Sequence, residues 1–269
     1  MTGGSINDAW RYETERGPIF VKLSARTAAD MFAAEADGLE ALASAAAVPV
    51  PRVLSSGCSD SHAWLALEWI DFGPQTPEAG RALGEALARQ HRSMGERFGW
   101  RRDNTIGATP QRNDWREHWV GFLREWRLGF QLELALARGA RSRVIECGRR
   151  LCERLEDFFP GYTPVPSLLH GDLWGGNWGV TENGNAVIFD PAVYYGDREA
   201  DIAMTRLFGG FGHAFYTTYQ STWPLDQAAG TRSTLYNLYH VLNHFNLFGG
   251  EYLAKAGAMT DRLLAELGH

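Results

Sequence analysis

One short polar stretch, followed by a single acidic residue, constrains this chain more than any other feature. From His170 to Asn177 the sequence reads His-Gly-Asp-Leu-Trp-Gly-Gly-Asn, and Asp190 follows thirteen residues after Asn177. An Asp, an Asn five positions later and a second Asp are the residues with which protein kinases bind a hydroxyl group and magnesium. The spacing from Asp172 to Asn177 is that of the kinase pattern H-R-D-x-x-x-x-N. The stretch therefore predicts a site for a hydroxyl group and a divalent ion.

The residues between Asn177 and Asp190 predict a β-hairpin that would bring these two side chains together. Each side of Asn183-Gly184 reads as a short strand, and this pair is the strongest short signal for a two-residue turn. The register of such a turn, extended along the strands, places Asn177 directly opposite Asp190, with Cβ atoms about 5 Å apart on one face. One small divalent ion fits between them. An ordinary hairpin with capped ends is the alternative interpretation.

The composition excludes several function classes. The net charge is −6 and the isoelectric point about 5.8, so no overall basic field attracts nucleic acid or anionic lipid. No run of eighteen apolar residues predicts a membrane span, and the first residues lack the basic and apolar regions of a signal peptide. Three cysteines, at positions 58, 147 and 152, form neither a metal-binding spacing nor a disulfide framework. We expect a cytoplasmic protein with neither nucleic acid nor membrane as a partner.

A Lys and a Glu in the first part of the chain predict an ion pair. Lys22 lies on the second of two predicted strands, which follow a Gly-rich opening at Gly3-Gly4-Ser5. The backbone N–H groups of such an opening can approach phosphates, although a plain tight turn has the same signature. Glu35 falls in the apolar stripe of a helix predicted over residues 28–46, where a carboxylate is costly unless it is paired. Lys22 is the nearest upstream partner, as in the kinase Lys–Glu pair that positions ATP phosphates. The alternative is that Glu35 lies at the edge of the stripe and reaches water.

The distribution of predicted elements indicates two lobes. A mostly apolar strand over residues 63–70 ends at Asp71-Phe72-Gly73-Pro74, which reads as a hinge. The chain before it is rich in strands, and the chain after it is mostly helical. We therefore expect an α+β fold with a small antiparallel-sheet N-lobe, residues 1–73, and a mostly helical C-lobe, residues 74–269. The nucleotide is expected between them.

Two histidines, His240 and His244, stand four residues apart on a helix predicted over residues 235–248. This spacing can bind zinc. The Glu of the H-E-x-x-H pattern is absent, however, and no third ligand is evident. We interpret the pair as a polar helix face or as histidines of the core.

Two motifs give the chain a resemblance to a known family. H-G-D-L-W-x-x-N at residues 170–177 and D-P-A-V-Y-Y-G at residues 190–196 resemble the fructosamine-3-kinase (ketosamine-3-kinase) family. These are small-molecule kinases of the protein-kinase-like fold, related to aminoglycoside and choline kinases. The resemblance covers almost the whole chain. Relatives normally carry a helix and a first strand before the Gly-rich loop, which here begins at the third residue, so we expect the N-lobe to lack that strand.

The resemblance implies a role for each site residue. Asp172 would be the catalytic base, Asn177 and Asp190 would bind Mg²⁺, and Lys22 with Glu35 would position the phosphates of ATP. Further contacts would come from Gly3, Gly4 and Ser5 at the phosphates, from the backbone of Glu68 to Ile70 at adenine, and from Trp174 stacked on the sugar part of the substrate.

The resemblance also implies an activity. This is ATP-dependent phosphorylation of the 3-hydroxyl of a ketosamine, which destabilises the sugar-amine adduct and so repairs glycated protein. The partner would be a small sugar-amine or a glycated protein lysine, and Asp197 and Glu199 are expected to give an acidic pocket for its amine. Two alternatives are a same-fold kinase of another small alcohol, such as an aminoglycoside or amino alcohol, and a catalytically weak nucleotide-binding protein.

Overall fold

The computed structural model describes residues 8–268, and their mutual contacts divide the chain into two compact units. The first unit contains the chain up to Ser93 together with His170–Val193 and Gly210–Pro224. The second contains Met94–Leu169, Tyr194–Gly209 and the chain from Leu225 onward. These units are groups of contacting residues, and the lobe boundary expected after residue 73 stays a prediction.

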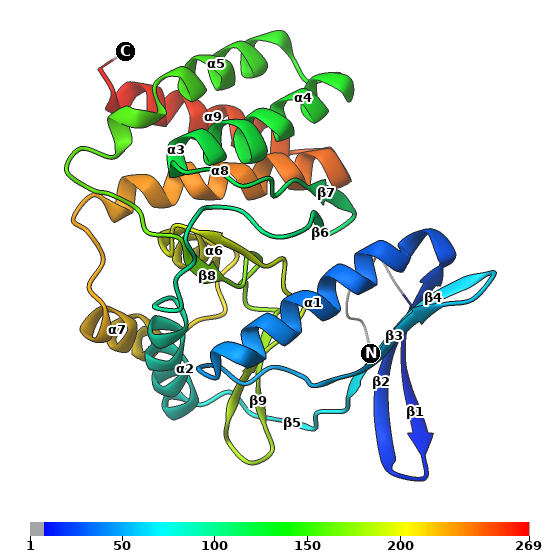
Figure 1. Ribbon diagram of the computed structural model, residues 1–269. Coiled ribbons are helices and arrows are strands. Elements are labelled where there is room, and N and C mark those ends of the chain that lie inside the picture. Colours follow the sequence, from blue (N-terminus) through cyan, green and yellow to red (C-terminus); the bar gives the residue numbers. More distant parts are fainter. Residues whose placement is uncertain (1–7, 269) are drawn as a thin grey trace. The chain divides into compact units, whose positions relative to one another are not determined.

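A four-stranded antiparallel sheet opens the first unit, with the strand order β1-β2-β4-β3. Helix α1 packs on one face of this sheet, where Phe32 and Leu39 meet Leu65 and Leu67 in a buried cluster (Figure 1). These strands and this helix match those predicted from sequence. Their bounds are β1 Asp8–Thr14, β2 Gly17–Ala25, η1 Arg26–Ala28, α1 Ala29–Ala45, β3 Val53–Cys58 and β4 His62–Glu68.

The rest of the first unit holds a small sheet and two helices in close contact. Thr76 caps the N-terminus of α2, and its hydroxyl accepts a hydrogen bond from the Ala79 N–H at 3.2 Å. Helix α7 approaches α2 at Gly84, where a Cβ atom would lie 2.3 Å from the Phe215 carbonyl oxygen. The elements are β5 Phe72–Gly73, α2 Pro77–Gln90, β9 Trp178–Thr181, β10 Ala186–Ile188 and α7 His213–Thr222, with the strand order β10-β9-β5.

The second unit is mainly helical, and α8 packs against α4, α6 and α9. The helical stretch that includes α3 begins at Trp119, and it contains a π-helical segment that carries the buried Arg127. Two short strand pairs, β6 with β7 and β8 with β11, complete the unit. The elements are β6 Asn104–Ile106, β7 Thr109–Gln111, α3 Trp119–Phe122, η2 Leu123–Gly129, α4 Phe130–Ala137, α5 Ser142–Glu153, η3 Leu155–Phe158, β8 Ser167–Leu169, β11 Tyr194–Gly196, α6 Glu199–Leu207, α8 Ala229–Phe248 and α9 Tyr252–Glu266.

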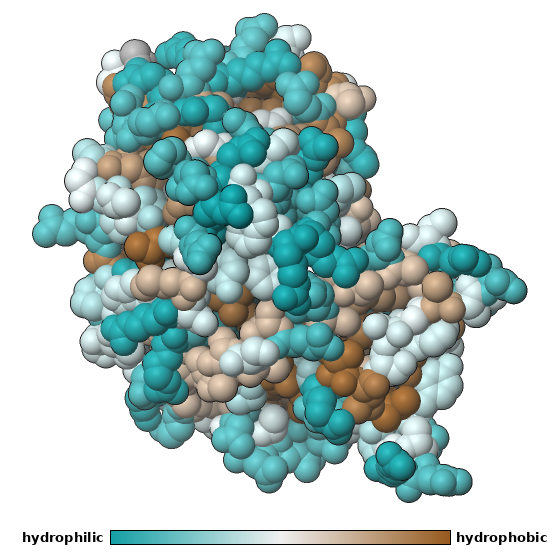
Figure 2. Space-filling model, viewed as in Figure 1, coloured by the Kyte–Doolittle hydropathy of each residue, from teal (hydrophilic) through white to brown (hydrophobic). Residues whose placement is uncertain are grey.

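The face shown in Figure 2 is mostly hydrophilic, with hydrophobic side chains in small separate patches. Within residues 8–268, no helix combines the length and the apolar character that a membrane span requires.

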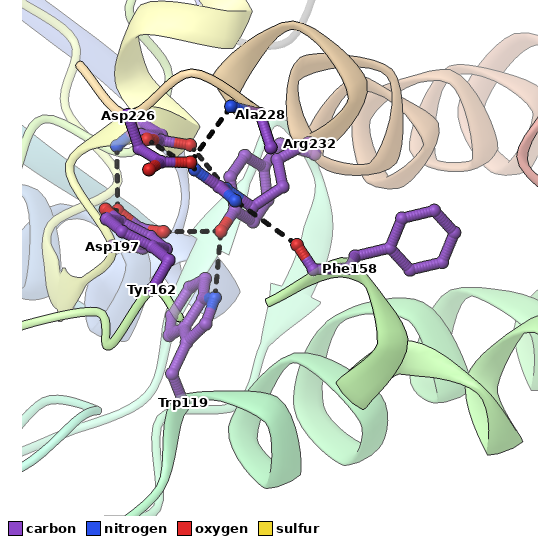
Figure 3. A network of polar contacts seen from close by, with 9 residues as sticks. Trp119, Phe158, Tyr162, Asp197, Asp226, Ala228 and Arg232 are labelled. Carbon is purple, nitrogen blue, oxygen red and sulfur yellow. Dashed lines mark hydrogen bonds and ion pairs between the residues drawn. The ribbon is translucent and has the colours of Figure 1, made fainter. Parts of the chain in front are cut away.

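The acidic pocket expected from Asp197 and Glu199 is not formed, because both carboxylates are buried. Figure 3 shows the polar network of the second unit around Asp197 and Arg232. Asp197 accepts hydrogen bonds from the hydroxyls of Tyr162 at 2.9 Å and Tyr236 at 2.5 Å. The Glu199 carboxylate accepts hydrogen bonds from Nε and Nη2 of the Arg232 guanidinium, at 2.8 and 3.0 Å. Neither carboxylate is available to a substrate amine, so this expectation was wrong.

Arg232 is the centre of this network, and its side chain has no solvent exposure. Besides Glu199 it binds Asp226 Oδ1 at 2.6 Å and the Phe158 carbonyl oxygen at 3.2 Å. Its guanidinium carbon lies 4.0 Å from the ring centroid of Tyr162. The side chain thus ties α8 to the start of α6 and to the segment that precedes α8.

His240 and His244 do not form a metal site. Within residues 8–268 no group of three or more His, Cys, Asp or Glu side chains could hold a metal ion. His240 is buried, and its Nδ1 has no hydrogen-bond partner among the described residues. Burial lowers the pKa of His240 to about 3, so the ring is a neutral part of the core.

We expect His240 to make folding stability depend on pH. The unfolded chain protonates this ring near the ordinary pKa of about 6.5, whereas the native state resists protonation down to about 3. Below pH 6.5 the unfolded state binds the extra proton, so native stability falls as the pH falls. The loss between pH 7.5 and 5 is about 2 kcal/mol. Urea unfolding of wild type and His240→Leu at both pH values measures it. An equal loss in both proteins would assign the pH dependence to other groups.

Candidate active site

Apart from Asp197 and Glu199, every predicted site residue that the structure describes lies in the first unit. Gly3, Gly4 and Ser5 lie outside the described residues. The remaining positions are Lys22, Glu35, Glu68, Ile70, Asp172, Trp174, Asn177 and Asp190.

The loop from Asp172 to Asn177 is closed by its own hydrogen bonds. The Asp172 carbonyl oxygen accepts from the Trp174 N–H at 3.1 Å and from the Asn177 Nδ2 at 2.8 Å. Asn177 Nδ2 also lies 3.4 Å from the Asp172 carboxylate oxygen Oδ2. The Asn amide thereby holds the Asp172 backbone and carboxylate in place.

His170 joins this loop to the segment that ends at Asp190, a function that the sequence analysis did not assign. The buried ring accepts the Asp172 N–H at Nδ1, at 3.3 Å. Because Nδ1 is the acceptor, Nε2 carries the proton and donates to the Phe189 carbonyl oxygen at 3.0 Å. One neutral imidazole therefore links the backbone of Asp172 to that of Phe189, the residue before Asp190. The His of the His-Gly-Asp motif was the available signal.

The hairpin between Asn177 and Asp190 forms, but its predicted register was wrong by one residue. Ile188 pairs with Trp178, and the Phe189 N–H donates to the Asn177 carbonyl at 3.0 Å, so Asn177 lies opposite Phe189. The cause is the turn. Only Gly184 adopts a positive φ, of 82°, and Asn183 does not, which gives a three-residue loop in place of the two-residue turn.

Asp190 nevertheless reaches the site through its backbone. It is one of two non-glycine residues within 8–268 with a positive φ, here 57°. This left-handed conformation, uncommon for a residue with a side chain, turns the chain after the strand. Asn177 Nδ2 lies 3.4 Å from the Asp190 carbonyl oxygen. The structure therefore brings together Asp172, Asn177 and Asp190, by a route other than the predicted cross-strand pair.

Lys22 completes the cluster by contacting two carboxylates. Its Nζ lies 2.7 Å from Glu35 Oε1 and 2.7 Å from Asp190 Oδ1. Burial opposes the charge of Lys22, but Glu35 and Asp190 outweigh it and raise the pKa of the ammonium above its ordinary value. Burial raises the pKa of Glu35, whereas Lys22 lowers it. Lys22 is thus a permanent cation held between two elements distant in sequence.

The oxygens of Asn177 and Asp190 fit a magnesium ion that also binds phosphates and water. Among residues 8–268, none donates a hydrogen bond to Asn177 Oδ1 or to Asp190 Oδ2. Mg²⁺ prefers oxygen ligands, keeps several waters and is commonly held by one or two carboxylates plus substrate phosphates. A pair of protein oxygens suits that chemistry better than an all-protein cage.

Trp174 belongs to the Asp172 loop, and the segment from Glu68 to Ile70 runs from the end of β4. Trp174 is 40% exposed, and its indole covers Gly176, where a Cβ atom would come within 2.3 Å of the ring. Glu68 ends β4, opposite Ile19 of β2, and the chain leaves the sheet at residue 69. An exposed indole beside the Asp172 loop offers a flat apolar face.

Comparisons with known proteins place this geometry in a family. The profile of the fructosamine kinase family matches residues 1–266. A Synechocystis protein named as a probable ketoamine kinase is 44% identical over 98% of this chain and 89% of its own length. The chloroplastic protein-ribulosamine 3-kinase of Arabidopsis thaliana is 40% identical over 98% of this chain and 82% of its own length.

Comparison with solved structures identifies the same family. A Haemophilus somnus 129PT protein, described as a candidate fructosamine-3-kinase, has a TM-score of 0.90 at 30% identity, covering 98% of this chain and 90% of its own. The aminoglycoside phosphotransferase APH(4)-Ia has a TM-score of 0.67 at 18% identity, covering 100% and 94%, and shares the fold. The expected two-lobed, α+β protein-kinase-like fold is confirmed. The chain belongs to the fructosamine kinase family.

Proposed function

We propose that this protein is an ATP-dependent kinase that phosphorylates the 3-hydroxyl of a ketosamine, a sugar-amine adduct of the fructosamine or ribulosamine type. The observation that carries the proposal is the clustering of Asp172, Asn177, Asp190, Lys22 and Glu35 in one compact unit. The names of the relatives, ketoamine kinase and protein-ribulosamine 3-kinase, support the substrate class. Free sugar-amines and glycated protein lysines both carry the required hydroxyl.

Each residue of the cluster has a part that its chemistry supports. Asp172, held by Asn177, would accept the proton of the attacking 3-hydroxyl. Lys22 would bind ATP phosphates, with Glu35 keeping the ammonium in position. Asn177 Oδ1 and the Asp190 carboxylate would hold Mg²⁺, which when bound offsets the negative charge of the phosphates. The Glu68–Ile70 backbone would contact adenine, and Gly3, Gly4 and Ser5 the phosphates.

The reaction explains a repair function. A phosphate at C3 is a good leaving group once the ketosamine enolises toward C1, so it departs as inorganic phosphate. Water then hydrolyses the resulting imine and releases the amine. For a glycated lysine, this sequence restores the free side chain. We also propose the cytoplasm as the compartment, supported by three free cysteines.

The substrate class is tested with a panel of ketosamines, ribulosamines, aminoglycosides and amino alcohols, with ATP consumption as the readout. Ketosamines and ribulosamines should give the highest kcat/KM. Turnover of an aminoglycoside or an amino alcohol in preference to both would assign the enzyme to another branch of the fold. ATP binding without turnover on any member would indicate a nucleotide-binding protein.

Trp174→Ala should change substrate selectivity more than ATP binding. The indole cannot take a proton, and it can offer only its face to the carbons of a sugar. We expect kcat/KM to fall unevenly across three sugar-amines, while the KM for ATP stays within about twofold of wild type. Trp10, 51% exposed on β1, provides a matched control, because Trp10→Ala should affect all three substrates by one factor. A uniform loss in Trp174→Ala with a lowered Tm would make Trp174 a packing residue.

A further inference from the structure

Lysine is almost absent from this protein. Of 26 basic residues, 24 are arginines, and only Lys22 and Lys255 are lysines. Sugar aldehydes form Schiff bases with the neutral amine of lysine. The guanidinium of arginine stays protonated at any physiological pH and is a poor nucleophile for this reaction. Addition of an aldose to a side chain of this protein is therefore confined to two amines.

Lys22 is protected from that reaction. It is 9% exposed, and its Nζ contacts Glu35 and Asp190 at 2.7 Å each. Both carboxylates stabilise the ammonium form, which has no lone pair to attack a carbonyl. An aldose can neither reach this nitrogen nor find it deprotonated.

Lys255, in contrast, is exposed and has no carboxylate partner among the described residues. It is exposed on α9, and no carboxylate within residues 8–268 forms an ion pair with it. Its Nζ lies 5.7 Å from the ring centroid of Phe208, a side chain that is itself 40% exposed. The amine is therefore accessible, and an apolar surface lies beside it.

The ring of Phe208 also packs against a histidine. The ring centroid of His244 lies 4.9 Å from that of Phe208 and 5.2 Å from that of Tyr252. Burial lowers the pKa of His244, and the charge of Lys255 acts in the same direction, so the ring is a neutral base at pH 7. A neutral imidazole near an amine is the group that proton transfers at a Schiff base require.

We propose that Lys255 is the side-chain glycation site of this protein, at which an open-chain aldose condenses beside Phe208 and His244. The Lys255 nitrogen adds to the aldehyde carbon, and water leaves to give the imine. Loss of the proton at the sugar C2 and protonation at C1 then give the ketoamine, with no net oxidation or reduction. The product belongs to the substrate class proposed above. Resting on that proposed function, we further infer that one copy of the enzyme repairs Lys255 of another.

The first experiment tests glycation alone. The folded protein is incubated with ribose in the absence of ATP, and adducts are mapped by peptide mass spectrometry over time. The Lys255 peptide should gain the ketoamine while the Lys22 peptide stays unmodified. His244→Gln should slow the gain about tenfold, less than the 10²–10⁴-fold typical of an evolved general base. Equal modification of Lys22, or no adduct on Lys255, overturns the proposal, and an unchanged rate in His244→Gln removes His244 from it.

The second experiment tests repair between copies. Asp172→Asn protein, glycated at Lys255, is incubated with ATP and Mg²⁺, with or without unmodified wild type. The adduct should persist alone and disappear when wild type is added, whereas Lys255→Arg protein accumulates no adduct there. If the Lys255 adduct persists although the added wild type phosphorylates a free ketosamine, repair between copies is refuted. If the adduct persists and the wild type also fails to phosphorylate a free ketosamine, the result contradicts the proposed function instead.

Discussion

Asp172→Asn should lower kcat by about 10²–10⁴-fold while the protein still binds ATP. The amide keeps the shape of the carboxylate but cannot accept the proton of the substrate hydroxyl, and general-base catalysis contributes that range. The fold should be retained, because the loop is closed by the Asp172 carbonyl oxygen, which accepts from Trp174 and Asn177 and is unchanged by the substitution. Steady-state kinetics with a ketosamine, together with calorimetric titration of ATP, measure the two effects separately.

Asp60→Asn is the matched control for this experiment. Asp60 is an exposed acid in the same unit, and its nearest cation is Arg26 at 3.5 Å. The control should keep wild-type kcat and ATP affinity. If Asp172→Asn retained more than about a tenth of wild-type kcat, Asp172 would not be the general base.

Arg232→Ala should lower the free energy of unfolding by about 3–5 kcal/mol, the cost of removing one partner from a buried ion pair. The substitution leaves the Glu199 carboxylate buried without its two hydrogen bonds, and it removes the contacts to Asp226 and Phe158. Denaturant unfolding followed by circular dichroism measures the change. Arg138→Ala, at an exposed arginine directly after α4, should stay within about 0.5 kcal/mol of wild type.

A second variant separates loss of pairing from loss of packing. Arg232→Met with Glu199→Gln removes both charges and keeps most of the buried volume, so it should recover part of the stability. If the double variant were as unstable as Arg232→Ala, the arginine would stabilise the protein by its stacking on Tyr162 and its contact with Phe158, not by pairing with Glu199.

The sequence was most informative where a pattern has a local physical cause. Glu35 could be assigned to Lys22 because a carboxylate in an apolar helix stripe needs a partner, and the structure places the two side chains 2.7 Å apart. The strands around Lys22 and the helix that carries Glu35 followed from alternation and helical spacing. The fold class followed from the order of these elements and from the two motifs.

The failures have equally specific causes. The hairpin register depended on the conformation of one residue, Asn183, whose backbone does not adopt the positive φ that a two-residue turn requires. Asp197 and Glu199 were misread because their partners come from distant segments, with Arg232 lying 33 residues after Glu199. The contact between Lys22 and Asp190 spans 168 residues, and no local pattern could reveal it.

That contact between Lys22 and Asp190 has a thermodynamic consequence. A divalent ion that binds the Asp190 carboxylate must compete with the ammonium already 2.7 Å from Oδ1. Phosphates that draw Lys22 toward themselves weaken this competition, and an ion on Asp190 in turn frees Lys22 for phosphates. We therefore expect nucleotide and metal ion to bind with positive cooperativity, and by linkage each should raise the affinity of the other by the same factor. With the proposed ligands, the lysine would act as a resident counter-ion that favours joint occupancy of the site over occupancy by either ligand alone.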